Sequence, residues 1–174
     1  MGGMAAANVP IEVRVARAAD EAQLARLDRA SWTPQSGFPS VTRQAGGLFF
    51  TAGSPPQAHL VGMIDGAVVG YIRLGVPSPL PEEAHVLAVH GLAVAPEARR
   101  RGVGTALLAA AEQRARARGA RKLSLRVLST NPTAIRLYQQ FGFEQEGRLV
   151  GEFFINGHYV DDLLLTKHLG TPPS

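Results

Sequence analysis

The chain has 174 residues, of which 45% are hydrophobic, so it is long enough for one domain with a sizeable core. It has no cysteine, which excludes disulfides, thiolate zinc sites and a cysteine nucleophile, and which fits a reducing compartment. The 18 Lys and Arg residues exceed the 14 Asp and Glu residues only modestly, giving a formal net charge of +4.

The first ten residues, MGGMAAANVP, lack the basic leader and apolar core of a secretory signal, and Met4 offers an alternative start. No apolar run approaches the roughly 20 residues that a membrane-spanning helix needs. We therefore expect a cytoplasmic protein with a loose tail at residues 1–10 and a single domain at residues 11–170.

The first third of the chain predicts a strand followed by a helix. Val13 and Val15 alternate with polar residues, as in a strand. A helix is expected next, with Asp20 as its N-cap. Its buried face should consist of Leu24, Leu27 and Ala30. Residues 33–57 are rich in Pro, Gly and Ser, and only a short helix near Val41 is expected there.

A β-hairpin is predicted next, in AHLVGMIDGAVVGYIRLG (residues 58–75), because Asp65-Gly66 can adopt the positive φ angles of a two-residue turn. The proline-studded loop VPSPLPEEAH follows and favours no regular element. The apolar residues 86–94 then predict a buried strand, interrupted by a bulge at His90-Gly91.

The second half of the chain alternates helices and strands. A helix is expected from Gly104 to Arg118, because apolar residues recur every fourth position and Gly119 can end it. KLSLRVL predicts a strand, a short helix follows Asn131-Pro132, and the final hairpin turns at Asn156-Gly157. This order predicts one mixed α/β sheet covered by helices.

Positive charge is concentrated in residues 99–122. Such a cluster favours an anionic partner, either a nucleic acid or a phosphorylated small molecule, although its second half could also be a solvated helix face. The cluster consists of Arg99, Arg100, Arg101, Arg114, Arg116, Arg118, Arg121 and Lys122.

The first three of these arginines lie in a strand-to-helix turn, VAPEARRRGVGTALL. The first N–H groups of a helix have no intrahelical partner, and the helix dipole adds positive charge there. Gly102 and Gly104 lack a β-carbon that would block an oxygen-rich group. The segment therefore predicts a pyrophosphate site, although it matches neither the Walker A loop nor the dinucleotide fingerprint. Taken alone, the two glycines could also simply allow a tight connection between the strand and the helix.

LAVAPEARRRGVGTALL resembles the acetyl-CoA signature of the GNAT superfamily of N-acetyltransferases, with Arg99, Gly102 and Gly104 in its three specified places. NPTAIRLYQQFGF is similar to a second block of that family, N-x-x-A-x-x-L-Y-x-x-x-G-F. The resemblance implies an α/β (α+β) fold with a single mixed, mostly antiparallel central sheet flanked by helices, over residues 11 to 169.

The same resemblance implies how acetyl-CoA would bind. The backbone amides of residues 99–105 would hold the pyrophosphate, and the strand before them would pair with the pantetheine arm. Asn131 would contact that arm, and Tyr138 would lie beside the thioester sulfur. The residues expected to bind acetyl-CoA are Leu92, Ala93, Val94, Arg99, Arg100, Arg101, Gly102, Val103, Gly104, Thr105, Asn131, Ala134 and Tyr138.

Acetyl transfer needs a neutral amine, a donor to the oxyanion and a proton for the leaving thiolate. Tyr138 is the candidate for the last task, and the backbone N–H near Val94 for the second. His90 is the candidate base, on the side of the strand that Val94 occupies if no bulge intervenes. Glu82, Glu83 and His85 are alternative bases, and no metal is expected.

Two further groups of residues are candidates for the acceptor pocket. His158, Asp161 and Asp162 on the last hairpin could line it, or they could simply face water. Trp32 and Phe38 could form its far wall, by analogy with similar proteins.

The favoured function is direct acetyl transfer from acetyl-CoA to a primary amine of a small molecule, in a ternary complex. Alternatives are acetylation of a protein N-terminus or lysine, a CoA-binding protein without catalysis, and a basic nucleic-acid binder. No aromatic residues are interleaved with the arginines, which argues against the nucleic-acid binder. A homodimer is expected only by analogy.

Overall fold

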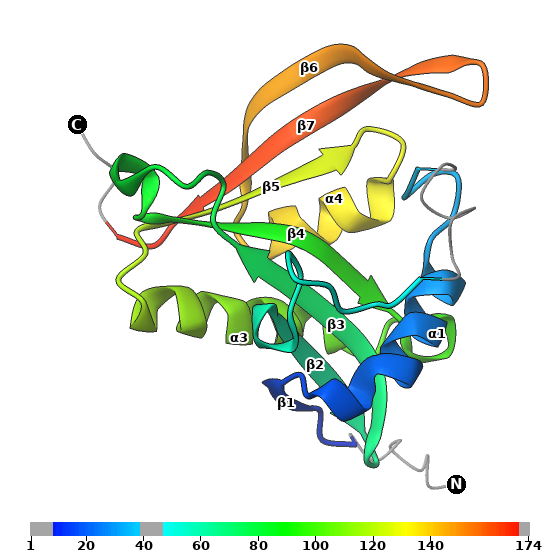
Figure 1. Cartoon of the computed structure of the whole chain (residues 1–174). Helices are drawn as coiled ribbons and strands as arrows, with labels where there is room; N and C mark the ends of the chain where they lie inside the picture. Colours follow the sequence, from blue (N-terminus) through cyan, green and yellow to red (C-terminus); the bar gives the residue numbers. More distant parts are fainter. Residues whose placement is uncertain (1–8, 39–46, 171–174) are drawn as a thin grey trace, which may run out of the picture.

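The protein forms one seven-stranded sheet in the order β1-β2-β3-β4-β5-β7-β6 (Figure 1). This is a computed structural model, and it describes residues 9–38 and 47–170. Of the strand pairs in the sheet, β4 and β5 run parallel and the others antiparallel. The predicted mixed, mostly antiparallel sheet flanked by helices is confirmed.

The elements follow the predicted order closely. The strands are β1 (Glu12–Val15), β2 (His59–Ile64), β3 (Ala67–Gly75), β4 (Val86–Val94), β5 (Lys122–Leu128), β6 (Glu144–Ile155) and β7 (His158–His168). The α-helices are α1 (Glu21–Ser31), α3 (Val103–Ala117) and α4 (Pro132–Gln140). Four 3-10 turns are η1 (Ala18–Asp20), η2 (Pro56–Ala58), η3 (Pro81–Glu83) and η4 (Pro96–Ala98).

Both predicted hairpin turns are confirmed. Asp65 and Gly66 have φ angles of 49° and 78°, and Asn156 and Gly157 have φ angles of 50° and 84°. Two consecutive positive φ angles match the right-handed twist of the flanking strands, which explains why Asp-Gly and Asn-Gly stand there.

The helices cover opposite faces of the sheet. On one face α3 packs against β2 and β3, where a β-carbon on Gly70 would come within 2.9 Å of Val103. Because side chains alternate along a strand, the next residue, Tyr71, points to the opposite face, where its hydroxyl donates to Asp28 of α1. The N-terminus of α3 also contacts α4, through Gly104 and Leu137. The candidate active site lies on the face of the sheet that α1 covers only in part.

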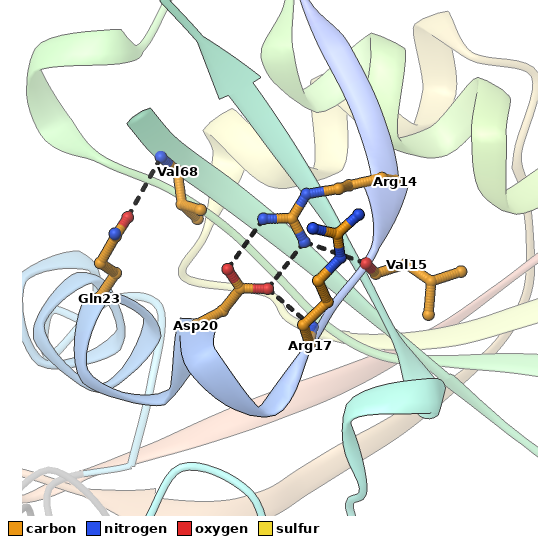
Figure 2. Close-up of polar contacts among 6 residues, drawn as sticks. All are labelled: Arg14, Val15, Arg17, Asp20, Gln23 and Val68. Carbon is orange, nitrogen blue, oxygen red and sulfur yellow. Dashed lines mark hydrogen bonds and ion pairs between the residues drawn. The ribbon is translucent and has the colours of Figure 1, made fainter. Parts of the chain in front are cut away.

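The start of α1 differs from the sequence-based prediction. The Asp20 carboxylate makes no N-cap hydrogen bond; it accepts two hydrogen bonds from the Arg14 guanidinium, at 2.8 and 2.9 Å, and one from the Arg17 amide at 2.7 Å (Figure 2). Asp20 ends the preceding 3-10 turn and fastens it to β1. Asp20 is thus the N-cap residue of α1 by position, as predicted, but its carboxylate does not cap the helix.

The predicted buried face of α1 is confirmed only in part. Leu24 and Leu27 are in the core, whereas Ala30 is exposed and Ser31 is the third buried residue of the helix. Gln23 accepts a hydrogen bond from the Val68 amide at 3.4 Å and so links α1 to β3 (Figure 2).

The expected helix near Val41 and residues 1–8 of the expected tail lie outside the described residues. None of the helices in the described ranges is long and apolar enough to cross a membrane.

Candidate active site

The two central strands, β4 and β5, separate partway along their length. They pair only where Val86–Val89 lies against Lys122–Leu125, and they diverge from there (Figure 1). Leu92, Ala93 and Val94 pair with β3 on one side, and their other edge faces the opening. An unpaired strand edge offers backbone donors and acceptors to an extended ligand with amide groups.

The turn between β4 and α3 presents a row of free backbone donors. In the part of the chain that the structure describes, the amides of residues 100–105 donate no hydrogen bond, and the first helical bond is from Ala106 to Gly102. Arg100 and Gly102 have positive φ angles of 61° and 84°, which fold the turn tightly against the helix N-terminus. Such a terminus is suited to binding a diphosphate.

The two glycines of this turn have different roles. Gly102 provides the left-handed backbone conformation directly before α3. Gly104, the second residue of α3, lies in the contact between α3 and α4, because a β-carbon there would come within 2.9 Å of Cδ2 of Leu137. The sequence suggested that both glycines make room for a ligand, but the β-carbon missing at Gly104 would face α4.

The arginines of the basic cluster also divide into two groups. Arg99 is held by chain carbonyls, since its Nε donates to Val94 and its Nη2 to Ser31, at 3.2 and 3.3 Å. Arg100 and Arg101 are exposed beside the free amides. Farther along the chain, Arg116 pairs with Glu112, Lys122 pairs with Glu146, and Arg114 donates to the carbonyl of Gln57. The second half of the cluster is therefore largely committed to intramolecular contacts.

Helix α4 brings three expected residues to the opening. Asn131 caps the helix by accepting a hydrogen bond from the Ala134 amide at 3.2 Å. Asn131, Ala134 and Tyr138 all line the same cavity. Burial raises the pKa of Tyr138 to about 12, so its phenol keeps its proton at neutral pH. Its ring packs edge-on against Phe143, with centroids 5.8 Å apart.

The bulge predicted in β4 is confirmed, and it changes the position of His90. Arg73 pairs with Gly91 while Leu74 pairs with Val89, so His90 is the extra residue. The imidazole lies against Gly75, on the face where Arg73 points, whereas Val94 pairs with Gly70 and so faces α3. Because the bulge is present, His90 does not share the side of the strand that Val94 occupies.

His90 nevertheless lines the cavity. The residue is exposed overall, but partial desolvation of its ring, and secondly repulsion by the Arg73 charge, lower its pKa below the ordinary value of 6.5. A backbone hydrogen bond to Val76 acts in the opposite direction. A neutral imidazole is therefore the dominant form at neutral pH, as a general base requires.

The alternative bases are only partly brought to the cavity. Glu83 lines it and accepts a hydrogen bond from the Ser78 hydroxyl at 2.5 Å. Glu82 and His85 are exposed, and neither belongs to the lining.

Of the candidate acceptor residues on the last hairpin, one reaches the cavity. Asp162 is 2% exposed, lines the cavity and pairs with Arg126. Asp161 pairs instead with Arg148 and accepts the Gly151 amide, and His158 is exposed at the turn. The alternation of side chains along β7 explains why Asp161 and Asp162 point to opposite faces, whereas His158 lies at the turn where β7 begins.

Trp32 and Phe38 both line the cavity. The segment between them crosses from α1 toward the C-terminal strands. The carbonyl of Gln35 accepts a hydrogen bond from Thr130 at 2.9 Å, and the Phe38 ring lies 4.8 Å from that of Phe153 in β6. The segment therefore forms a wall on the far side of the opening.

The cavity, of about 1000 Å³, continues from the β4–β5 opening into a chamber under α1. Three residues of that chamber were not predicted from sequence: Asp28, Tyr71 and Arg73. Tyr71 and Trp32 both donate to Oδ1 of Asp28, at 2.5 and 2.6 Å. No local sequence motif identifies these residues as part of a site. The only sequence signal is that Tyr71 and Arg73 are two positions apart in β3 and so point to the same face of the sheet. In the described ranges no group of His, Asp or Glu side chains could hold a metal ion.

A model of one known protein family matches most of this chain. The family model described as "Acetyltransferase (GNAT) family" matches residues 22–143. The chain belongs to the GNAT acetyltransferase family. Its fold is that of the GNAT acetyltransferases.

The names of two curated relatives specify small amines as their acceptors. The spermidine N(1)-acetyltransferase of Vibrio cholerae is 33% identical over 106 residues, which cover 60% of this chain and 54% of that protein. The L-amino acid N-acetyltransferase AaaT of Escherichia coli is 35% identical over 117 residues, or 67% of this chain and 71% of that protein. The match to the first relative thus spans about half of its length.

Two solved structures superpose over nearly the whole chain. The smu.2055 protein of Streptococcus mutans has a TM-score of 0.74 and 27% identity, covering 92% of this chain and 99% of its own. A phosphinothricin acetyltransferase of Sinorhizobium meliloti, crystallised with acetyl-CoA, has a TM-score of 0.71 and 25% identity, covering 94% and 93%.

Proposed function

We propose that this GNAT protein transfers the acetyl group of acetyl-CoA to a primary amine of a small molecule, by direct attack in a ternary complex. The observation that carries the proposal is one continuous cavity, which runs from the free edge of β4 to a walled chamber under α1. A cosubstrate and an acceptor can therefore meet in it without a covalent enzyme intermediate.

The free amides of residues 100–105, with the exposed Arg100 and Arg101, would hold the diphosphate. The open edge at Leu92–Val94 and the side chain of Asn131 would hold the pantetheine arm. Arg99 would act indirectly, because its hydrogen bonds to Val94 and Ser31 fix the turn in place.

The acceptor amine has an ordinary pKa near 10, so it must lose a proton before it attacks. His90 would take that proton, directly or through water, since its imidazole is neutral and lines the chamber. The amine nitrogen then bonds to the acyl carbon, the carbon–sulfur bond breaks, and the thiol leaves. A backbone N–H near Val94 would stabilise the charge on the acyl oxygen, and Tyr138 would donate its proton toward the sulfur.

The wall of the chamber favours a small acceptor over a protein. Residues 32–38 bridge from α1 to Thr130 and Phe153, and aromatic rings from this segment line the cavity. A protein N-terminus or a lysine side chain would need an open groove for its flanking residues. The names of the two curated relatives, which specify spermidine and L-amino acids, also support a small amine.

The test is release of CoA from acetyl-CoA with a panel of amines, polyamines, amino acids and peptides. We expect transfer to small amines, and Tyr138→Phe should lower kcat by about 100-fold or more while calorimetry finds unchanged CoA affinity. Tyr159→Phe, on the exposed part of the last hairpin, is the matched control. Faster transfer to peptides would favour a protein acceptor. No heat with CoA at millimolar concentration would refute the proposal.

A cytoplasmic location, a homodimer and the domain limits at residues 11–170 remain predictions.

Two alternative functions make different predictions. If the protein binds CoA without catalysis, Tyr138→Phe should leave acetyl transfer unchanged. The nucleic-acid alternative is weakened because Arg116 and Lys122 are engaged in ion pairs.

A further inference from the structure

The Asp28 carboxylate is fixed in one orientation within the chamber. The Tyr71 hydroxyl and the Trp32 indole N–H both donate to the same oxygen, Oδ1, from different elements. Within residues 9–38 and 47–170 no cationic side chain lies within ion-pair distance of this carboxylate, and no hydrogen bond reaches Oδ2. A positioned anionic oxygen therefore remains available on the cavity wall.

The Arg73 guanidinium lies in the same chamber and is also held by the chain. Its Nη2 donates to the carbonyl of Gly53 at 3.0 Å. In the described ranges no carboxylate lies within ion-pair distance of it. A guanidinium has five N–H donors, so most of them remain for another partner. Its positive charge acts on His59 and His90, which places it among the residues that line the chamber.

Asp28 and Arg73 thus face one cavity without forming an ion pair. Opposite charges in a partly enclosed cavity attract strongly, and two free side chains would close on each other. The aromatic donors hold Asp28 in place, and the Gly53 carbonyl restrains Arg73. The chamber therefore keeps one negative and one positive group apart, and a ligand that carries both charges satisfies both groups.

We infer that the acceptor is a small amphoteric amine, an amino acid or a close analogue, whose acid group binds Arg73 and whose amino group binds Asp28 before reaction. This inference rests on the proposed function and specifies its acceptor. Asp28 orients the ammonium, which then passes its proton toward His90. Arg73 makes the acid group a requirement, because a guanidinium binds a carboxylate with two parallel hydrogen bonds.

The experiment measures kcat/KM for matched sets of acceptors: each amino acid, its amide, and the amine left after removal of the carboxyl group. In the wild-type protein the acids should exceed both partners by about 10- to 100-fold, the range expected for charge-assisted hydrogen bonds. Spermidine is included as an amine with no acid group.

Variants assign the preference to individual residues. Arg73→Gln should lower kcat/KM for the acids by about 10- to 100-fold and leave the amides within about threefold, with Arg73→Lys between the two. Asp28→Asn keeps an oxygen for Tyr71 and Trp32 and should raise KM for every amine. Arg118→Gln and Asp65→Asn, at exposed positions far from the chamber, should change neither quantity. Calorimetry with CoA shows that each variant is folded and binds its cosubstrate.

The outcomes separate this inference from the proposed function. Equal or faster transfer to the amides, the decarboxylated amines or spermidine would overturn the inference while leaving the acetyltransferase intact. Loss of transfer to all acceptors in Arg73→Gln would also overturn it, because the residue would then serve more than the acid group. Absence of transfer to every compound would overturn both. A preference for acids that disappears only in Arg73→Gln supports it.

Discussion

The imidazole of His90 lies directly over Gly75, and its Nε2 is 2.8 Å from the position that a β-carbon at residue 75 would occupy. The bulge in β4 produces this contact, because it turns His90 toward the face of the sheet that carries Arg73. The absence of a β-carbon at Gly75 thus leaves room for the imidazole of the candidate base.

Gly75→Ala should therefore displace the imidazole. Because His90 is a side chain that can move, we expect little loss of stability, and a reduction of kcat/KM by about tenfold or more from misplacement of the base. The measurement is steady-state kinetics beside urea unfolding. Gly170→Ala is the control, since a β-carbon there would meet only Arg121, at 4.0 Å. Unchanged kinetics in Gly75→Ala would argue against His90 as the base.

The charge of Arg73 should also be visible in the titration of His90. Burial and this charge lower the pKa of His90 below 6.5, so removal of the charge in Arg73→Gln should raise it. The acid limb of kcat/KM, which requires neutral His90, should then move to higher pH. Proton NMR of the imidazole, assigned with His90→Gln, measures the pKa without any acceptor. A pKa that stays unchanged or falls would contradict the prediction, and Arg118→Gln should have no effect.

The role of Gly104 can be tested by a double-mutant cycle with Leu137. Gly104→Ala forces its methyl group against Cδ2 of Leu137, and Leu137→Ala opens room for it. We expect a favourable coupling of about 1 kcal/mol between the two substitutions in urea unfolding. If the glycine serves helix packing, the double variant should bind CoA with the affinity of Leu137→Ala alone. Reduced affinity from Gly104→Ala in both backgrounds would instead indicate that the glycine makes room for phosphate.

The turn geometry in the proposed cosubstrate half could be predicted from sequence because its determinants are local. The glycine turn before α3 and the short helix after Asn131-Pro132 each arise within a few neighbouring residues, whereas the open edge of β4 depends on where β5 diverges from it. The hairpins were predictable for the same reason, since Asp65-Gly66 and Asn156-Gly157 set their own turn geometry.

Trp32, Phe38 and Asp162 were among the predicted pocket residues and do line the cavity, but the contacts that organise the acceptor half could not be predicted because they join distant parts of the chain. Tyr71 and Asp28 are 43 residues apart, and nothing near either residue marks the other as a partner. The side of His90 also depends on the bulge, which reverses the alternation that a regular strand would give. Asp20 occupies the predicted N-cap position, but its carboxylate binds the Arg14 guanidinium and not the first amides of the helix.

That ion pair should make the protein sensitive to acid. Hydrogen bonding from Arg14 lowers the pKa of Asp20 below 3.8, and the carboxylate is only 6% exposed. Its contribution to the free energy of unfolding is therefore complete above the unfolded pKa of about 3.9, and it is lost as the pH falls through the lowered folded value. Asp20→Asn should cost about 2 kcal/mol at pH 7, and this difference should shrink below pH 4.

Urea unfolding of the wild type and Asp20→Asn between pH 3 and pH 7 measures this difference directly. Asp65→Asn, at an exposed turn where Asn is equally suited, is the matched control and should follow the wild type throughout. Equal stability at pH 7, or a difference that stays constant down to pH 3, would mean that the Arg14–Asp20 pair does not hold the first strand to the helix. The pH dependence of the difference distinguishes loss of the ion pair from a general packing defect at residue 20, which would destabilise the protein equally at every pH.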